Sequence, residues 1–337
     1  MRKKILFFAV LFVMVAVVYR MSVFSPELVS FSGPTMGTTY TVKFFSTEEV
    51  DGSSGLKDDV DAALVKVNKL MSTYDPNSEL SLFNKLPAGQ SATISEDMAY
   101  VIDKALLISE MSGGEYDVTI GPLVNLWGFG PGKREDKVPS QAQIDEAKSL
   151  VGYRLLSLDG RRLSKDKDIY VDLSSIAKGY GVDVVAKVLE AQGVDSYLVE
   201  VGGEIVSKGM KADGSPWRIA IESPAGGHDI AERVIAITNV AVATSGDYRN
   251  YFEKNGVRYS HTISPVTGKP ITHKLVSVTV VEKTTTMADG LATAITVLGP
   301  DKGLEFAQKN GIAAYLLVKT DFGFEERSSD AFKPYLN

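Results

Sequence analysis

Residues 275–298 read LVSVTVVEKTTTMADGLATAITVL and place two kinds of secondary structure next to each other in the chain. Residues 275–281 are rich in valine, which favours a β-strand. Residues 285–298 are predicted to form a helix, for which Thr285 or Thr286 can supply the N-cap oxygen. The segment therefore predicts a strand that leads directly into a helix.

The same mixture of strands and helices extends outward from this segment in both directions. Strand-like runs are predicted at residues 38–45, 169–173, 197–201, 217–222, 234–238, 240–244, 259–263 and, as the final strand, 314–318. Helical patterns are predicted at residues 56–71, 95–111, 140–150, 175–192 and 302–308. Because the strands form groups that suit antiparallel pairing, with helices between the groups, the sequence indicates an α+β fold rather than a doubly wound parallel sheet. Since we find neither a long linker nor a repeat, residues 25–337 are expected to form one domain of largely antiparallel sheets packed with helices.

The composition is that of a globular protein and narrows the possible chemistry. The net charge of −6 provides no field that would attract nucleic acid, so nucleic acid is not an expected partner. The chain has no cysteine, which excludes disulfides, thiolate metal ligands and a thiol nucleophile. Its histidines, His228, His261 and His273, form no closely spaced pair. A metal site would therefore use oxygen ligands, which suit Mg²⁺ or Ca²⁺.

The N-terminus has the charge pattern of an export signal. Arg2, Lys3 and Lys4 precede an uninterrupted apolar run over residues 5–19. Residues 1–24 are predicted to be either a cleaved signal peptide or an uncleaved signal anchor, and we find no small-residue cleavage site that would decide between them. These positive residues predict that the N-terminus lies on the cytoplasmic side of the membrane and the rest of the chain on the outer side.

Asp289 and Thr293 are four residues apart in the predicted helix, so they lie on one helical face. A carboxylate and a hydroxyl arranged in this way can ligate one small cation. On spacing alone an ordinary interpretation remains open, in which Asp289 merely favours the positive end of the helix dipole and Thr293 is tolerated.

Residues 170–181, YVDLSSIAKGYG, predict a second polar corner. A buried strand would deliver Asp172, and a helix would begin at Ser174 or Ser175. Free backbone N–H groups, hydroxyls and Lys178 would then meet at the start of this helix, which suits a phosphate group. A capped helix without a ligand, with Lys178 on the surface, is the alternative.

Several other residues are candidates for a cleft wall. Met36 lies in a glycine-containing turn and could contact a flat ring, and Tyr74 could stack on an aromatic ligand or simply cover the end of a helix. Residues 115–117, EYD, precede an aromatic, glycine-rich segment. His261 and Asp247 are polar candidates for proton chemistry, although a lone histidine is more often structural, and the absence of a GxSxG motif argues against a catalytic triad.

Taken together, these motifs resemble the ApbE family of FAD:protein FMN transferases. The segments MGTTY, STYDPNSELS, YDVTIGPLVNLWGFG, VDLSSIAKGYGVD, VEVGGEI, ATSGDYRNYF, YSHTISPVTGKP and MADGLATA occur in the order seen in that family. The resemblance extends from about Gly33 to the C-terminus. It implies that FAD is cleaved at its pyrophosphate, that FMN is joined by a phosphoester to a Thr or Ser of an acceptor protein, and that AMP leaves.

The resemblance also assigns site residues by their position in these segments. Asp289, Thr293 and the backbone carbonyl of Ser175 are expected to ligate Mg²⁺. FAD, which is a substrate, is expected to contact Met36, Tyr74, Glu115, Tyr116, Asp117, Asp172, Lys178 and Ile263. With Asp289 as the catalytic metal ligand, His261 and Asp247 are candidates for positioning or deprotonating the acceptor hydroxyl.

The expected acceptors are redox proteins, such as subunits of membrane NADH:quinone or electron-transport complexes. The expected location is the periplasmic face of the cytoplasmic membrane. Many family members are lipoproteins anchored through a cysteine, and because this chain has none, an uncleaved N-terminal helix is the expected anchor. Two alternatives remain open: a Mg²⁺-dependent pyrophosphatase that yields FMN and AMP, and an exported flavin-binding protein without catalysis.

Overall fold

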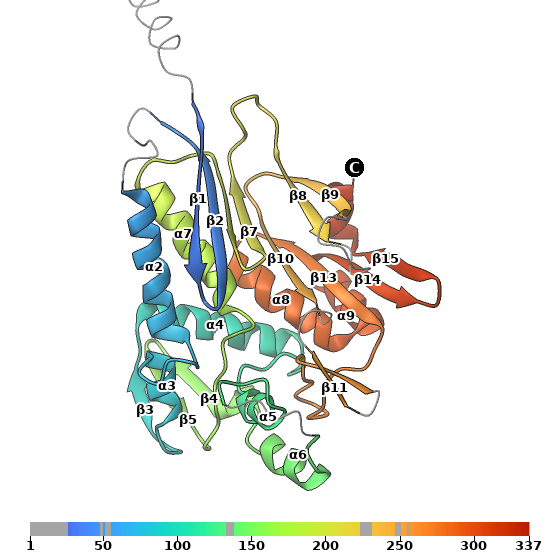
Figure 1. Cartoon of the computed structure of the whole chain (residues 1–337). Helices are drawn as coiled ribbons and strands as arrows, with labels where there is room; N and C mark the ends of the chain where they lie inside the picture. Colours follow the sequence, from blue (N-terminus) through green and yellow to red (C-terminus); the bar gives the residue numbers. More distant parts are fainter. Residues whose placement is uncertain are drawn as a thin grey trace, which may run out of the picture.

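The computed structural model describes residues 26–47, 50, 55–132, 138–222, 231–246, 251–254 and 257–336. Its largest element is an eight-stranded sheet with the order β1-β2-β6-β7-β10-β13-β14-β15, in which all neighbouring strands run antiparallel (Figure 1). These strands are β1 (Leu28–Thr35), β2 (Thr38–Phe45), β6 (Tyr197–Val201), β7 (Glu204–Lys208), β10 (Ala241–Gly246), β13 (Leu275–Glu282), β14 (Ala313–Thr320) and β15 (Gly323–Ser328). The α+β prediction with a large antiparallel sheet is therefore confirmed.

Helices and three smaller sheets complete the described structure. The helices are α2 (Leu56–Met71), α3 (Glu79–Asn84), α4 (Glu96–Met111), α5 (Gly121–Leu126), α6 (Gln141–Lys148), α7 (Ala177–Ala191), α8 (Thr285–Leu298) and α9 (Pro300–Lys309), with 3-10 turns at Tyr153–Leu155 and Asp330–Leu336. The smaller sheets are β3 (Ser91–Thr93) with β5 (Arg162–Lys165) and β4 (Leu156–Asp159), the pair β8 (Trp217–Glu222) and β9 (Ala231–Ile237), and the pair β11 (Tyr251–Lys254) and β12 (Val257–Ser260).

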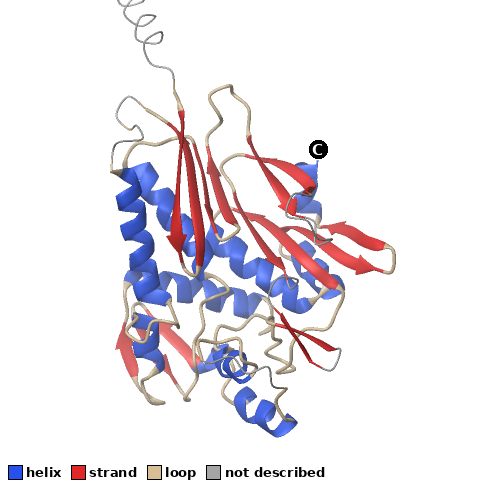
Figure 2. Cartoon of the chain, viewed as in Figure 1, coloured by secondary structure: helices blue, strands red, loops and turns tan. Residues whose placement is uncertain are grey.

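The large sheet has a hydrophobic core on each face, because successive side chains of a strand point to opposite sides. On β14, Leu316 belongs to the core that includes Leu291 of α8. Its neighbour Tyr315 belongs to the opposite core, with Trp217 of β8, and stacks on Phe332 with ring centroids 5.4 Å apart. Figure 2 shows helices α7 and α8 behind the strands of the large sheet. Two helices are thus held side by side on one face.

The predicted strand at residues 169–173 is wrong. The structure has an isolated bridge between Ile120 and Tyr170, and no strand there. The reason is that side chains satisfy this backbone: the Asn84 amide donates to the Val171 carbonyl at 2.9 Å and accepts the Val171 N–H at 2.8 Å, and the buried Lys165 ammonium donates to the Ile169 carbonyl. Together with the bond from the Asp172 N–H to the Val118 carbonyl, these side chains satisfy the backbone without a continuous neighbouring strand.

Other predicted boundaries also shift. Helix α7 begins at Ala177 rather than at Ser174 or Ser175, and the N-cap of α8 is Thr284, whose side chain accepts the Met287 N–H, rather than Thr285 or Thr286. The strand predicted at residues 259–263 ends at Ser260, and β15 follows the strand that was predicted to be the last. Strands β1 and β7, which belong to the large sheet, are not among the predicted strands.

The predicted export segment, residues 1–24, lies outside the described residues. Within the part of the chain that the structure describes, no helix combines the length and hydrophobicity that crossing a membrane requires.

Candidate active site

Two adjoining clefts open where the start of α7 meets α8. The first cleft has a volume of about 350 Å³ and is lined by residues of α8, of the segment before α7 and of the segment after β12. The second cleft has a volume of about 620 Å³ and lies between the β1–β2 turn, the end of α2 and the start of α7. Tyr74, Asp172, Ser174 and Lys178 line both clefts, so one elongated ligand could occupy the two together.

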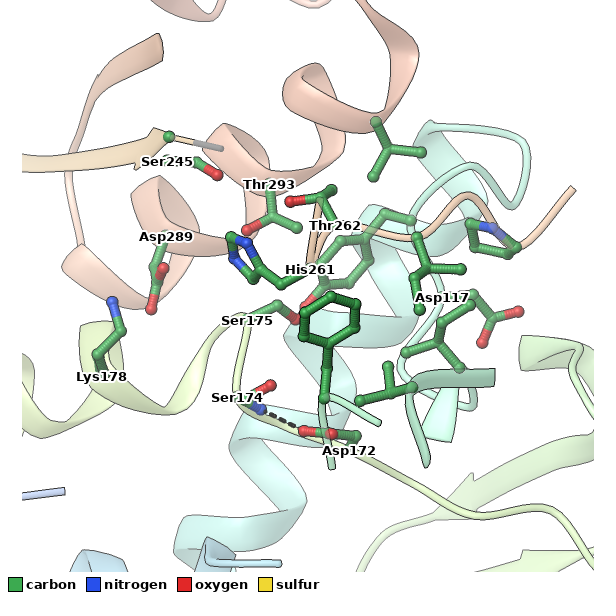
Figure 3. Close-up of a pocket in the computed structure, with 18 of the residues that line it drawn as sticks. Asp117, Asp172, Ser174, Ser175, Lys178, Ser245, His261, Thr262, Asp289 and Thr293 are labelled. Carbon is green, nitrogen blue, oxygen red and sulfur yellow. Dashed lines mark hydrogen bonds between the residues drawn. The ribbon is translucent and has the colours of Figure 1, made fainter. Parts of the chain in front are cut away.

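The structure brings the predicted site residues together. Each one that it describes lines one or both clefts: Met36, Tyr74, Glu115, Tyr116, Asp117, Asp172, Ser175, Lys178, His261, Ile263, Asp289 and Thr293. Figure 3 labels seven of them. Asp247 lies outside the described residues. The roles given to these residues stay predictions, but residues from distant parts of the chain share one surface.

Asp289 is a buried carboxylate on α8 that faces the first cleft. It is 6% exposed, and its Oδ2 accepts the backbone N–H of Gly179 at 2.9 Å. Burial raises the pKa of Asp289, although the positive charge of Lys178 and the Gly179 hydrogen bond oppose the rise. A buried anion of this kind is stabilised by a bound cation. Thr293 lies one helical turn farther along and lines the same cleft (Figure 3).

The oxygen donors around Asp289 fit a hard cation. The Ser175 hydroxyl donates to the Tyr116 hydroxyl at 3.0 Å, so the side chain has a partner and the backbone carbonyl is the atom predicted to bind metal. Among the described residues, no group of three or more His, Cys, Asp and Glu side chains could hold a metal ion. One carboxylate, one hydroxyl and one carbonyl still suit Mg²⁺, because Mg²⁺ usually keeps water and phosphate oxygens as its other ligands.

Gly179 lets α7 approach α8 closely enough for its backbone to bond Asp289. A Cβ atom at this position would lie 2.3 Å from the Thr285 carbonyl oxygen and 2.8 Å from the Asp289 Cβ. We expect Gly179→Ala to lower the free energy of unfolding by about 1–3 kcal/mol, because neighbouring backbone would have to move.

The control for this prediction is Gly181→Ala in the same helix. A Cβ there would meet the terminal methyl of Met36, the flexible end of a side chain, at 2.8 Å. Both changes give α7 the same gain in helix propensity, so urea unfolding of the two variants compares the clashes directly. Equal stability of the two variants would contradict the close-approach explanation.

Lys178, which is partly exposed, and the buried Glu204 form an ion pair in the cleft that Asp289 also lines. The Lys178 ammonium contacts Oε1 of Glu204, the first residue of β7, which is 2% exposed and lines the first cleft. Burial, followed by the charge of Asp289, raises the pKa of Glu204. Burial lowers the pKa of Lys178, but the charges of Asp289 and Glu204 outweigh it and leave that pKa raised. Glu204 is not among the predicted site residues; the signal that could reveal it is an acidic residue directly after Gly202-Gly203, at the start of a strand.

Asp117 and Asp172 shape the loops that form the cleft walls. Asp117 accepts the N–H and hydroxyl of Thr119 through Oδ1 and the Tyr153 N–H through Oδ2. Asp172 accepts the Ser174 N–H at 2.9 Å, which turns the chain just before α7 (Figure 3). Both carboxylates are buried, so these hydrogen bonds fix the backbone around the first cleft.

Met36 and Tyr74 border the second cleft. Met36 has φ +47° and Gly37 φ +71°, so both central residues of the β1–β2 hairpin turn are left-handed. A left-handed backbone is uncommon for methionine, and such strain is often found at ligand sites. Tyr74 is 68% exposed at the boundary between the clefts, and its ring is therefore available to a ligand.

His261 lines the first cleft beyond the end of β12. Its ring meets the ring of Phe129 edge to face, with centroids 6.4 Å apart. The side chains of His261, Ser175 and Asp289 all project into the cleft in Figure 3. The cleft thus brings a titratable imidazole to the same space as the oxygen donors.

Comparison with known proteins identifies the family. The ApbE family model matches residues 36–316. The chain belongs to the ApbE family. A protein of Vibrio cholerae named FAD:protein FMN transferase is 48% identical over 312 residues, which cover 92% of this chain and 93% of the relative. A Haemophilus influenzae protein of the same name is 48% identical over 315 residues, covering 91% of each chain.

Solved ApbE structures share the fold. The flavin transferase ApbE from Vibrio cholerae matches with a TM-score of 0.87 at 46% identity, over 93% of this chain and 100% of that one. The ApbE family match spans α7, α8 and all the described cleft residues named above.

Proposed function

We propose that this chain is an FAD:protein FMN transferase that depends on Mg²⁺ bound at Asp289, Thr293 and the Ser175 carbonyl. The observation that carries the proposal is the convergence of these three residues in a cleft that adjoins a second, larger one. The family membership and the names of the relatives support the reaction. Clefts of this combined size suit a dinucleotide, because ligand pockets commonly have volumes of about 300–1,000 Å³.

The reaction needs positioning more than covalent help from the protein. The oxygen of an acceptor Thr or Ser attacks the phosphorus of the FMN half of FAD. The bond from this phosphorus to the bridging oxygen breaks, AMP leaves with that oxygen, and the hydroxyl proton passes to a base. Bound Mg²⁺ would neutralise pyrophosphate charge. Lys178 adds a positive charge where the two clefts meet, and His261 is the candidate base.

Tyr74 gives a direct test of where the ring system lies. We expect Tyr74→Ala to raise the KM for FAD by about tenfold, because stacking on an aromatic side chain contributes about 1–3 kcal/mol. Tyr74→Phe keeps the ring and should keep the KM close to that of the unchanged protein. An unchanged KM in Tyr74→Ala would place the flavin and adenine rings elsewhere.

The products of the reaction separate the proposal from its alternatives. The purified protein is incubated with FAD, Mg²⁺ and an acceptor domain, and AMP, free FMN and flavin fluorescence on the acceptor band are measured. Transfer predicts AMP together with a fluorescent acceptor, which is lost when the acceptor Thr is replaced by Val. Free FMN and AMP without a fluorescent acceptor would show a pyrophosphatase. Unchanged FAD would show a flavin-binding protein without catalysis.

We also propose that the protein acts outside the cytoplasmic membrane, held there by the apolar segment at residues 5–19. The support is the Arg2-Lys3-Lys4 sequence before that segment and the absence of a cysteine for lipid attachment. N-terminal sequencing of the protein from the membrane fraction tests the anchor. A mature N-terminus near Ser25 would show that the segment is cleaved.

A further inference from the structure

Three charged side chains line the first cleft, and two of them are buried while the Lys178 side chain is 33% exposed. Lys178 comes from the first turn of α7, Glu204 from the start of β7 and Asp289 from α8. Glu204 is 2% exposed and Asp289 is 6% exposed. One ammonium therefore lies near two carboxylates. The carboxylate that it does not contact directly remains accessible to another cation.

Glu204 is poorly explained as a structural residue. Its Oε1 contacts the Lys178 ammonium, but its Oε2 is buried and has no hydrogen-bond partner in the described part of the chain. An unpaired buried polar group is costly, and an apolar side chain of similar size would avoid the cost. Because Glu204 lines the cleft, the presence of a carboxylate at this position is explained by the effect of its charge on the other groups of the site.

Lys178 interacts differently with the two carboxylates. Lys178 touches Glu204, whereas it influences Asp289 through its electric field. Asp289 instead accepts the Gly179 N–H through Oδ2. If Glu204 lost its charge, Asp289 would be the strongest remaining attraction for the ammonium, since its charge heads those that raise the pKa of Lys178. A direct Lys178–Asp289 pair would then compete with a metal ion.

We propose that Glu204 is a positioning residue that holds the Lys178 ammonium away from Asp289 and so keeps the Asp289 carboxylate open to a divalent cation. This inference rests on the proposed metal site at Asp289. It predicts that the loss of Glu204 acts on metal binding through Lys178, so removing Lys178 as well should cancel the effect.

The experiment measures the affinity of the full chain for Mn²⁺, used as a probe for Mg²⁺, by titration calorimetry without FAD. E204Q keeps the size of the side chain and removes its charge, and it should weaken Mn²⁺ binding by about tenfold or more. The double variant K178M/E204Q should recover an affinity close to that of the unchanged protein. E200Q is the matched control, because Glu200 also acts on Lys178 through its field and has its own bond from the Gly203 N–H; its Mn²⁺ affinity should not change.

Three other outcomes would contradict either the inference or the proposed metal site. Unchanged Mn²⁺ affinity in E204Q would contradict the inference. A double variant as weak as E204Q would show that Glu204 binds the metal or supports the fold by itself, which also contradicts it. If D289N bound Mn²⁺ as well as the unchanged protein, the proposed metal site would be wrong, and the inference would fall with it.

Discussion

Replacing Asp289 with asparagine should slow FMN transfer by at least about a thousandfold, because a metal ion contributes several kcal/mol of charge stabilisation in the transition state. The amide oxygen of Asn can still accept the Gly179 N–H that Asp289 accepts now. Burial already disfavours the ionised form of this group, as its raised pKa indicates, so the variant should fold normally. The measurement is the initial rate of acceptor flavinylation at saturating Mg²⁺, with circular dichroism to confirm folding.

The control for this prediction is Asp301→Asn. Asp301 lies in the first turn of α9, with a side chain that is 88% exposed, and it pairs with Arg327 on the surface. Surface ion pairs contribute little, so this variant should transfer FMN at the normal rate. A folded Asp289→Asn variant with an unchanged rate would remove the metal site from the proposed function.

Replacing His261 with alanine should lower the rate constant for transfer by about a hundredfold to ten-thousandfold, which is the usual contribution of a general base. His261 lines only the first cleft, whereas Met36 lines the second and Tyr74 lines both, so FAD affinity should change much less. The test is to measure transfer rates and FAD binding separately, each as a function of pH.

Added imidazole provides the control for the His261 prediction. If His261 removes the proton from the acceptor hydroxyl, imidazole should restore part of the lost rate in His261→Ala, and it should not do so in Asp289→Asn. Equal losses of rate and FAD binding, without recovery by imidazole, would instead assign His261 a structural role.

Strong local patterns made some elements predictable from the sequence. The predicted strand at residues 275–281 and helix at 285–298 correspond to β13 (Leu275–Glu282) and α8 (Thr285–Leu298). A valine-rich run followed by a threonine-capped helix can be recognised from the local sequence without knowledge of distant contacts. Asp289 and Thr293 were therefore placed correctly on one helical face.

Elements that depend on distant partners were harder to predict. The segment at residues 169–173 has the composition of a strand, but the Asn84 side chain takes the place of a neighbouring strand, and nothing in the local sequence reveals that contact. Glu204 follows two glycines, and the sequence alone assigned it no role in the site. The proposed role of Glu204 depends on its ion pair with Lys178, 26 positions earlier in the chain, and on the charge of Asp289 in α8.

The candidate site illustrates both situations. Spacing alone favours an ordinary helix-end carboxylate at Asp289 over a metal ligand. The structure adds burial, the bond from Gly179 and the adjoining clefts, which none of the local patterns contains. The left-handed backbone of Met36 likewise could not be predicted, because glycine favours this conformation and methionine does not.

The most direct test of the proposed function is the intact mass of an acceptor domain after incubation with this protein, FAD and Mg²⁺. We expect the acceptor to gain the mass of one FMN less one water, one AMP to appear for each modified acceptor, and chelation of Mg²⁺ to stop both. An acceptor of unchanged mass, with FAD either intact or split into free FMN and AMP, would show that the protein is not an FMN transferase for that acceptor.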